Sequence, residues 1–198
     1  MIADQDFDAI VASVVTALRD GQVVVIPTDT VYGLAADPTS PTAMARLFEL
    51  KQRPDGVPVA VLVGSSEQAR ELVEATDVFE ALATAHWPGA LTMVANGLPD
   101  ALDLVHLGDV ATIGVRLPDH DLIRACADAF GPIAATSANR HGEPTIVDPV
   151  ELKTAFGSDV NLIIDGGVLD GTASTVADIT THPPTVLRQG VVHLDQTS

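Results

Sequence analysis

Four of the ten basic residues in this chain stand at the ends of predicted helices and strands. Lys51 and Arg53 close a helical segment, and Arg116 and Arg188 each end an apolar strand. In open α/β sheets ligands bind at such edges, and an arginine can hold a phosphate or a carboxylate with two hydrogen bonds. These positions therefore indicate a site for an anionic ligand. From spacing alone, an equally good explanation is that Lys51 and Arg53 complement the dipole at a helix end.

Three polar segments could complete such a site. Residues 135–142 place hydroxyl and amide side chains directly after a predicted strand, where a loop can also aim backbone N–H groups at a phosphate. Residues 27–34 carry two threonines, an aspartate and the only tyrosine, and residues 165–176 are rich in glycine, which lets backbone approach a ligand. Ordinary turns give the same patterns, so none of the three segments is specific by itself.

Other kinds of chemistry find less support in the sequence. The chain has no Gly-x-x-x-x-Gly-Lys-Ser/Thr loop, no Gly-x-Gly-x-x-Gly and no Gly-x-Ser-x-Gly. The six histidines lack the paired spacing of a metal site, so no protein ligand to a metal is identified. Cys126 lies in an apolar run, and we expect a core residue there rather than a catalytic thiol.

The composition narrows the class of protein further. Asp and Glu number 27 against 10 Lys and Arg, which gives a formal net charge of −17. A surface this acidic repels polyanions, so a broad, nonspecific grip on nucleic acid is disfavoured. The N-terminus lacks the basic start of a signal peptide, and no apolar run reaches the length of about 18 residues that spans a membrane. We therefore expect a cytoplasmic protein without a membrane partner.

Helices and strands are expected to interleave along the chain. Ile10, Val14, Ala17 and Leu18 recur at helical spacing, and Gly21 is well placed to end that helix. Further helices are expected after Ser40 with Pro41 in the first turn, after Ser65 or Ser66 through Leu72 and Val73, over 119–130, and over 149–156 with Asp148 as the cap. Strands are expected at 23–26, 59–63, 91–95, 111–115, 133–135, 162–164, 175–179 and 185–187. This alternation predicts one α/β domain, with a mixed sheet because the C-terminal part is rich in strands.

Seven short motifs occur in one order along the chain and are specific as a set. They are Pro27-Thr-Asp-Thr-Val-Tyr-Gly-Leu, Lys51-Gln-Arg-Pro, His86-Trp-Pro-Gly-Ala-Leu-Thr, Gly114-Val-Arg-Leu-Pro, Thr136-Ser-Ala-Asn, Ser174-Thr-Val and Leu187-Arg-Gln-Gly. Together they resemble the YrdC-type L-threonylcarbamoyladenylate synthase family over about residues 7–193. The resemblance implies a YrdC-like α/β fold, in which helices flank a twisted, mixed parallel and antiparallel sheet around a central cleft. On that basis residues 1–198 are expected to form a single catalytic domain, without the second C-terminal domain of longer relatives.

The resemblance also implies an activity. Members of the family bind ATP, L-threonine and bicarbonate, with Mg²⁺ carried by the ATP phosphates. The threonine amine takes up CO₂, the carbamate attacks the α-phosphate of ATP, and pyrophosphate leaves. The chain is therefore expected to be a nucleotidyltransferase that makes L-threonylcarbamoyl-AMP. A separate transferase complex uses this product to form threonylcarbamoyladenosine (t6A) at position 37 of tRNA, and direct RNA binding by this chain is expected to be weak or absent.

The family motifs assign roles to particular residues. The L-threonine site is expected to contain Thr30, Arg116, Thr136 and Ser174, with Arg116 facing the carboxylate. The ATP site is expected to contain Lys51, Arg53, Thr112, Ser137, Ala138 through its backbone, Asn139 and Arg188. Of these, the predicted catalytic residues are Lys51, Arg53, Ser137 and Asn139. Since the reaction joins two anions, positioning and charge neutralisation can supply most of the catalysis.

Three other functions stay open at this point. A paralogue of the same fold could have another adenylating or carbamoylating role, although the complete pairs Lys51/Arg53 and Ser137/Asn139 argue for retained ATP chemistry. An RNA-binding module would need a locally basic cleft, which the net charge disfavours. A nucleotide sensor would bind ATP without turnover.

Overall fold

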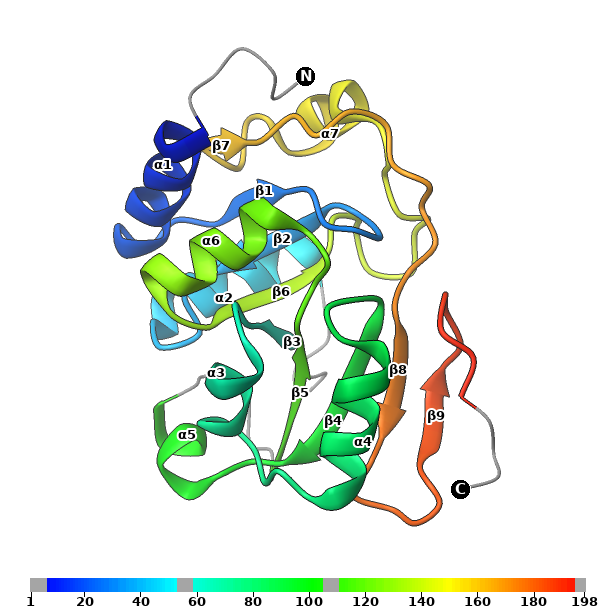
Figure 1. The fold of residues 1–198 in the computed structure, drawn as a ribbon. Helices are drawn as coiled ribbons and strands as arrows, with labels where there is room; N and C mark the ends of the chain where they lie inside the picture. Colours follow the sequence, from blue (N-terminus) through cyan, green and yellow to red (C-terminus); the bar gives the residue numbers. More distant parts are fainter. Residues whose placement is uncertain (1–6, 53–58, 105–110, 195–198) are drawn as a thin grey trace.

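One mixed β-sheet joins the strands of this protein. The computed structural model describes residues 7–52, 59–104 and 111–194. Over these residues the strand order is β7-β1-β2-β6-β3-β5-β4-β8-β9, and Figure 1 shows that β1, β2 and β6 run at a steep angle to β4, β8 and β9. The pairs β1/β7, β3/β5 and β4/β8 are parallel, and the remaining neighbours are antiparallel. The predicted twisted, mixed α/β sheet is thereby confirmed.

The strands lie close to their expected positions. Their bounds are Val24–Ile26 (β1), Gly33–Ala36 (β2), Ala60–Leu62 (β3), Leu91–Asn96 (β4), Thr112–Arg116 (β5), Ile133–Ser137 (β6), Leu162–Ile163 (β7), Thr175–Asp178 (β8) and Thr185–Arg188 (β9). β1 is buried on both faces, as its unbroken apolar run predicts. β2 is not among the expected strands, because its sequence, Gly-Leu-Ala-Ala, has small residues and lacks the β-branched run of a typical strand.

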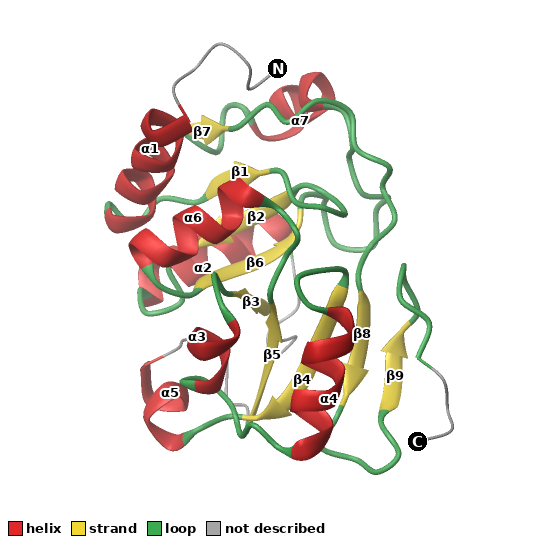
Figure 2. Ribbon diagram, in the orientation of Figure 1, coloured by secondary structure: helices red, strands yellow, loops and turns green. Residues whose placement is uncertain are grey.

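Seven helices flank this sheet in the part of the chain that the structure describes (Figure 2). Their bounds are Phe7–Arg19 (α1), Pro41–Lys51 (α2), Ser66–Arg70 (α3), Asp77–His86 (α4), Pro99–Leu104 (α5), Asp121–Phe130 (α6) and Pro149–Phe156 (α7). The predicted caps are confirmed: Ser40, Ser65 and Asp148 accept hydrogen bonds from the first turns of α2, α3 and α7. α4 and α5 were not expected, and α6 begins two residues later than predicted.

The helix expected to carry Leu72 and Val73 ends before them, at Arg70. The backbone of residues 72–74 pairs instead with the end of β4: Leu98 N–H donates to Leu72 O, and Glu74 N–H donates to Asn96 O. These long-range hydrogen bonds satisfy the backbone groups that a longer helix would have used internally. Leu72 and Val73 are still buried. The hydrophobic pattern therefore predicted two core residues correctly, but the helix that was expected to carry them ends before they are reached.

Two apolar clusters hold the helices to the sheet. The first cluster joins α1 and α6 to one face of β1, β2 and β6. The second cluster joins α2, α4 and α7 to the opposite face of these three strands and to β3, β5, β4 and β8. In β4 and β5, alternate residues Leu91, Met93, Ile113 and Val115 enter the second cluster. Because successive side chains of a strand point to opposite faces, the residues between them face away from this cluster.

Cys126 on α6 is fully buried, which confirms the core position predicted for it. Burial raises the pKa of its thiol to about 12. We therefore expect a thiol reagent at pH 8 to label Cys126 in the native protein at least about 10³-fold more slowly than a free cysteine, because only the thiolate reacts. Absorbance of released thionitrobenzoate measures the rate, and unfolded protein is the control. Labelling of native protein at the unfolded rate would contradict this placement.

Candidate functional site

The outward face of β3, β5, β4 and β8 forms one wall of a cavity of about 750 Å³. All of the predicted site residues line this cavity except Arg53, which lies outside the described residues, and Ala138, which is buried beside it. The lining residues with predicted roles are Thr30, Lys51, Thr112, Arg116, Thr136, Ser137, Asn139, Ser174 and Arg188. Segments more than 150 residues apart in the sequence thus meet in one cleft. Ala138 N–H donates to Tyr32 O at 2.8 Å and so fixes the backbone between two lining residues.

Lys51 is buried at one end of the cavity, where it binds the loop after β6. Its ammonium donates to Ser137 O at 2.6 Å, to Ser137 Oγ at 3.0 Å and to Asn139 Oδ1 at 2.5 Å. Ser137 Oγ also donates to Asn139 Oδ1 at 2.7 Å, so the three side chains form a closed hydrogen-bonded group. The ammonium therefore fixes the shape of the segment that was predicted to meet a phosphate, and it adds a positive charge at that position.

The same loop is also attached to the C-terminal end of α2. Arg140 donates to Leu50 O at 2.6 Å, and its guanidinium lies 5.0 Å from the ring centroid of Phe156. The His141 N–H donates to Lys51 O at 2.7 Å. These contacts occupy carbonyl groups that the end of a helix leaves without intrahelical partners. They keep Lys51 and the loop at a fixed separation.

Arg116 also lines the cavity, at the end of β5. Its guanidinium donates to Thr30 Oγ1 at 2.9 Å, to Asp29 Oδ1 at 2.6 Å and to Gly89 O at 3.0 Å. Burial lowers the pKa of Arg116, and the neighbouring Asp29 charge opposes that shift. Thr30 Oγ1 in turn contacts Thr28 Oγ1 at 3.0 Å, so the two hydroxyls of the 27–34 segment are linked to Arg116.

Ser174 connects the wall of β8 to the edge strand β9. Arg188 Nη2 donates to Ser174 O at 2.9 Å and to Ser174 Oγ at 3.1 Å. On the other side, Ser174 Oγ contacts Thr92 Oγ1 at 3.1 Å. Arg188 is exposed as a whole, and partial desolvation of its guanidinium lowers its pKa. A residue predicted for the threonine site is thereby hydrogen-bonded to a residue predicted for the ATP site.

Sequence reasoning missed Thr28, Asp29 and Thr92 as members of this site. Thr92 lines the cavity, is almost fully buried, and ends the recognised motif His86-Trp-Pro-Gly-Ala-Leu-Thr, to which no role was assigned. A threonine between the apolar residues Leu91 and Met93 of a strand is the signal that could have found it. Thr28 and Asp29 belong to a motif that was recognised, but the motif gave a role only to Thr30.

Tyr32, which lines the cavity, forms hydrogen bonds with the glycine-rich segment that includes Gly166 and Gly167. Its hydroxyl donates to Gly167 O at 2.7 Å and accepts from Gly166 N–H at 2.8 Å, and burial raises its pKa. We expect Tyr32→Phe to lower the free energy of unfolding by about 1–3 kcal/mol, because a buried N–H and a carbonyl lose their partner. Urea denaturation measures the change. Ser13→Ala, which removes a hydroxyl on exposed α1, is the control, and equal stability of the two variants would contradict the expected role.

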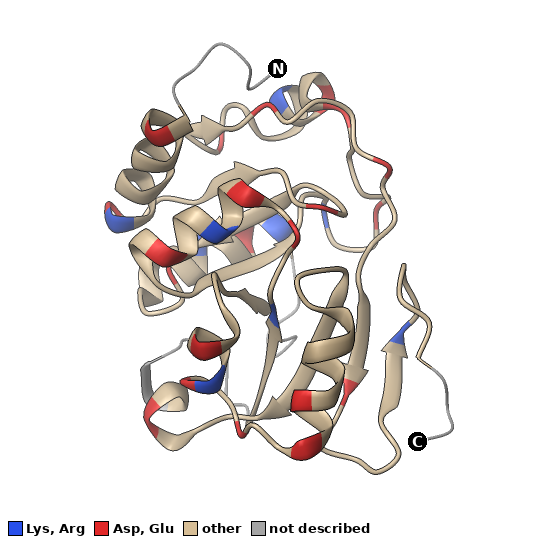
Figure 3. Ribbon diagram, in the orientation of Figure 1, with Lys and Arg blue, Asp and Glu red and all other residues tan. Residues whose placement is uncertain are grey.

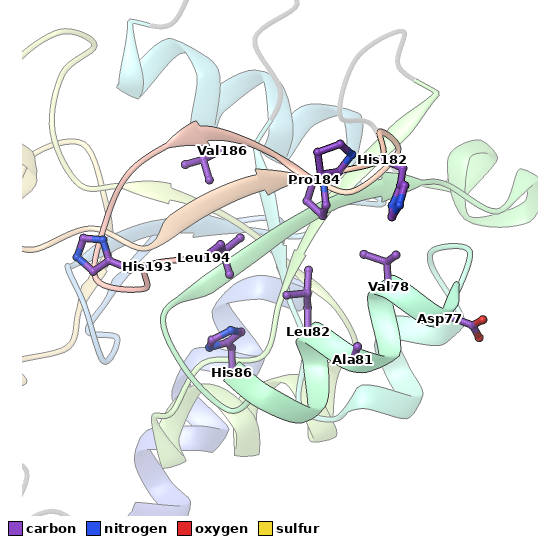
Figure 4. A pocket seen from close by; sticks show the side chains of 11 residues that line it. Asp77, Val78, Ala81, Leu82, His86, His182, Pro184, Val186, His193 and Leu194 are labelled. Atoms are coloured by element: carbon purple, nitrogen blue, oxygen red, sulfur yellow. The ribbon is translucent and has the colours of Figure 1, made fainter. Parts of the chain in front are cut away.

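A second cavity of about 420 Å³ lies between α4 and the segment around β9 (Figure 4). Its described lining consists of Asp77, Val78, Ala81, Leu82, His86, His182, Pro183, Pro184, Val186, His193 and Leu194. This lining has no Lys or Arg, so it does not suit a triphosphate. Acidic residues are scattered over helices, loops and the end of β8 (Figure 3). One of them, Asp178, lines the larger cavity, together with the three cations Lys51, Arg116 and Arg188. The larger cavity is therefore the candidate site for an anionic ligand.

Known proteins resemble this chain over most of its length. The family model Sua5_yciO_yrdC, described as "Telomere recombination", matches residues 16–190. The chain is 38% identical over 184 residues to the threonylcarbamoyl-AMP synthase of Pyrococcus abyssi, covering 90% of this chain and 53% of that protein. The crystal structure of P. abyssi Sua5 complexed with L-threonine superimposes with a TM-score of 0.86 at 35% identity, covering 93% of this chain and 55% of that one. E. coli YciO gives a TM-score of 0.86 at 30% identity, covering 95% and 92%. The chain thus spans about half the length of the P. abyssi relatives and most of YciO.

Within the part of the chain that the structure describes, no helix combines the length and the apolar character needed to cross a membrane.

Proposed function

This chain belongs to the Sua5/YciO/YrdC family, and from that premise we propose that it is a threonylcarbamoyl-AMP synthase. Its substrates are L-threonine, ATP and bicarbonate, and its products are L-threonylcarbamoyl-AMP, pyrophosphate and water. The observation that supports this most strongly is the single cavity that gathers the residues predicted for both substrates. The hydrogen bonds between Ser174 and Arg188 connect the two groups of residues directly.

The proposed reaction needs charge neutralisation at two places. At the threonine end, Arg116 meets the carboxylate, and the hydroxyls of Thr30 and Ser174 orient the amine that becomes the carbamate. At the nucleotide end, Arg188 and the segment held by Lys51 meet the triphosphate. The family motif gives Arg53 the same role, and this residue lies outside the described part of the chain. Mg²⁺ enters with the phosphates of ATP as part of the substrate. A carbamate oxygen attacks the α-phosphorus, and the bond to pyrophosphate breaks with its electron pair leaving on pyrophosphate.

In this proposal the rate enhancement comes from groups that are held in position before the substrates bind. The cationic groups and hydroxyls are already hydrogen-bonded to the protein, so they need little reorganisation when charge develops at phosphorus. The leaving pyrophosphate needs charge neutralisation rather than a proton. When the amine condenses with bicarbonate, one of its protons leaves with the bicarbonate hydroxyl as water, and the second proton lost from the ammonium form passes to solvent. The class of enzyme is a nucleotidyltransferase, since an adenylyl group passes from ATP to the carbamate.

The wider setting also stays a proposal. The product is consumed by a separate transferase complex that forms t6A at position 37 of tRNA, and the reaction takes place in the cytoplasm. The formal net charge of −17 disfavours tight binding of tRNA. We therefore expect this chain to release its product without binding the tRNA itself. Filter binding of tRNA at low and moderate salt tests that point, and tight binding without ATP would support the RNA-binding alternative.

A paralogue with another adenylating or carbamoylating role is the second candidate. The fold does not distinguish it from the synthase, because a fold alone does not determine the substrate, and YciO has the same TM-score as the threonine-bound structure. The identity to the P. abyssi synthase, 38% over 184 residues, is the reason for ranking the synthase first.

Pyrophosphate release from ATP distinguishes these functions. The purified protein is assayed with Mg²⁺, with and without L-threonine and bicarbonate. Release that needs both, together with a product of the mass of threonylcarbamoyl-AMP, supports the synthase. Folded protein that binds ATP but shows no threonine-dependent release would overturn the proposal. Release driven by a different amine or carboxylate would leave the paralogue in its place.

A further inference from the structure

The guanidinium of Arg116 is held by groups from two loops that flank the cavity. Its Nε–H donates to Gly89 O, its Nη1 to Thr30 Oγ1 and its Nη2 to Asp29 Oδ1. A guanidinium carries five N–H donors in one rigid plane. Three contacts in different directions therefore fix the orientation of that plane. One N–H on each terminal nitrogen remains for a ligand in the cavity that Arg116 lines.

Asp29 differs from the other two partners because it is charged and lies behind the arginine. The side chains of Arg116 and Asp29 are 6% and 13% exposed, and their closest atoms are 2.6 Å apart. Arg116 lines the cavity, whereas Asp29 is not among the described residues that line it. A ligand in the cavity would thus meet the guanidinium and not the carboxylate.

We propose that Asp29 is the positioning residue of Arg116: its carboxylate holds the guanidinium in the orientation that receives the carboxylate of the amino-acid substrate. Asp29 touches no substrate in this arrangement and acts only through Arg116. The inference rests on the proposed function, in which Arg116 binds L-threonine. It goes beyond that function by giving a role to a residue that neither the motifs nor the cavity lining singled out.

A purely charge-balancing role makes the opposite prediction. If Asp29 only neutralised Arg116, removing its charge would leave a stronger cation, and a carboxylate ligand would bind more tightly. If Asp29 positions Arg116, its removal frees the guanidinium, and the ligand binds more weakly. The direction of the change in threonine affinity therefore separates the two roles.

Two variants of Asp29 test the proposal. Asp29→Ala removes both the charge and the acceptor, and Asp29→Asn keeps an oxygen that can accept from Arg116. We expect the KM for L-threonine to rise at least about tenfold in Asp29→Ala and less in Asp29→Asn, with the KM for ATP changed less than about twofold. Asp119→Asn is the control, because Asp119 also pairs with an arginine, Arg124, but on the surface.

A second measurement does not depend on turnover. In protein labelled with ¹⁵N-arginine, the Nε–H signal of Arg116, assigned by its loss in Arg116→Lys, reports how firmly the guanidinium is held. We expect hydrogen exchange of this N–H to be at least about tenfold faster in Asp29→Ala than in the wild type, and intermediate in Asp29→Asn. Asp29→Asn also keeps the comparison available if Asp29→Ala folds poorly.

The two measurements separate the proposals from each other. A wild-type protein without threonine-dependent release would refute the proposed function, and the exchange rates would still decide whether Asp29 holds Arg116. Unchanged exchange in both Asp29 variants would overturn the positioning role. Faster exchange combined with an unchanged or lower KM for threonine would overturn it as well.

Discussion

Lys51→Met is expected to reduce threonine-dependent pyrophosphate release by at least about 10³-fold. The substitution keeps most of the aliphatic stem and removes the ammonium, which is buried and donates to Ser137 O, Ser137 Oγ and Asn139 Oδ1. Without it, Ser137 and Asn139 lose their common donor, and the segment between them is free to change shape. The cavity also loses a positive charge where the triphosphate is proposed to bind. Steady-state release of pyrophosphate measures the effect.

The controls separate a local effect from unfolding. Lys153 is the only other lysine of the chain and lies exposed on α7, so Lys153→Met should keep wild-type activity. Lys51→Arg should also be strongly impaired, because a planar guanidinium does not fit three acceptors that converge on one nitrogen. Thermal melts establish that each variant is folded. Activity of folded Lys51→Met within about threefold of the wild type would show that the ammonium is dispensable.

The positions of the cations were the part of the site most readily predicted from sequence. Lys51 and Arg116 were expected at the ends of a helix and a strand, and α2 and β5 end at these residues. Local signals, such as caps and the end of an apolar pattern, mark where a helix or strand ends. A residue at such an end can therefore be placed from the nearby sequence alone. The alternative that Lys51 only complements a helix dipole does not account for its three hydrogen bonds to the loop after β6.

Pairings between distant segments could not be predicted in the same way. The contact of Arg188 with Ser174 depends on the antiparallel register of β8 and β9, which an irregularity between Val176 and Ala177 shifts. The Asp29–Arg116 pair joins residues 87 positions apart. Nothing in the local sequence of either segment specifies the other. Such contacts follow from strand order, and that order also includes β2, whose small residues gave no strand signal.

The alternation of side chains along β4 and β5 determines which residues of these strands face the cavity. On β5, Ile113 and Val115 enter the apolar cluster, while Thr112, Gly114 and Arg116 line the cavity. β4 repeats the pattern, with Thr92 on the cavity side. Because the side-chain period of a strand is two, a shift of one residue in register would exchange the core and cavity faces completely. The core packing that stabilises this half of the sheet therefore also determines which polar groups face the ligand.

Gly190→Ala is expected to cause the largest loss of stability from a single added methyl group in this region. A Cβ on Gly190 would lie 2.6 Å from Ser174 O and closer still to Ala173 O, distances that real Cβ atoms essentially never show. The obstacle is the backbone of Ala173 and Ser174, so a rotamer change cannot relieve it. The turn after β9 must move away from the segment that precedes β8. Overpacking of this kind costs about 1–3 kcal/mol or more, and we expect the Tm to fall by about 5–10 °C.

The same displacement should reach the proposed chemistry. Gly190 N–H donates to Thr175 Oγ1, and two residues earlier Arg188 donates to Ser174 O and Ser174 Oγ. Moving this turn outward lengthens the Arg188 contacts, so the KM values for ATP and for L-threonine should both rise. That joint change distinguishes Gly190→Ala from Asp29→Ala, in which only the KM for threonine is expected to rise. Gln189→Ala, which changes an exposed side chain in the same turn, is the control and should affect both KM values much less. A Gly190→Ala protein with wild-type Tm and KM values would mean that β9 can move without disturbing Ser174, and the proposed coupling of the two substrate sites through Arg188 would be wrong.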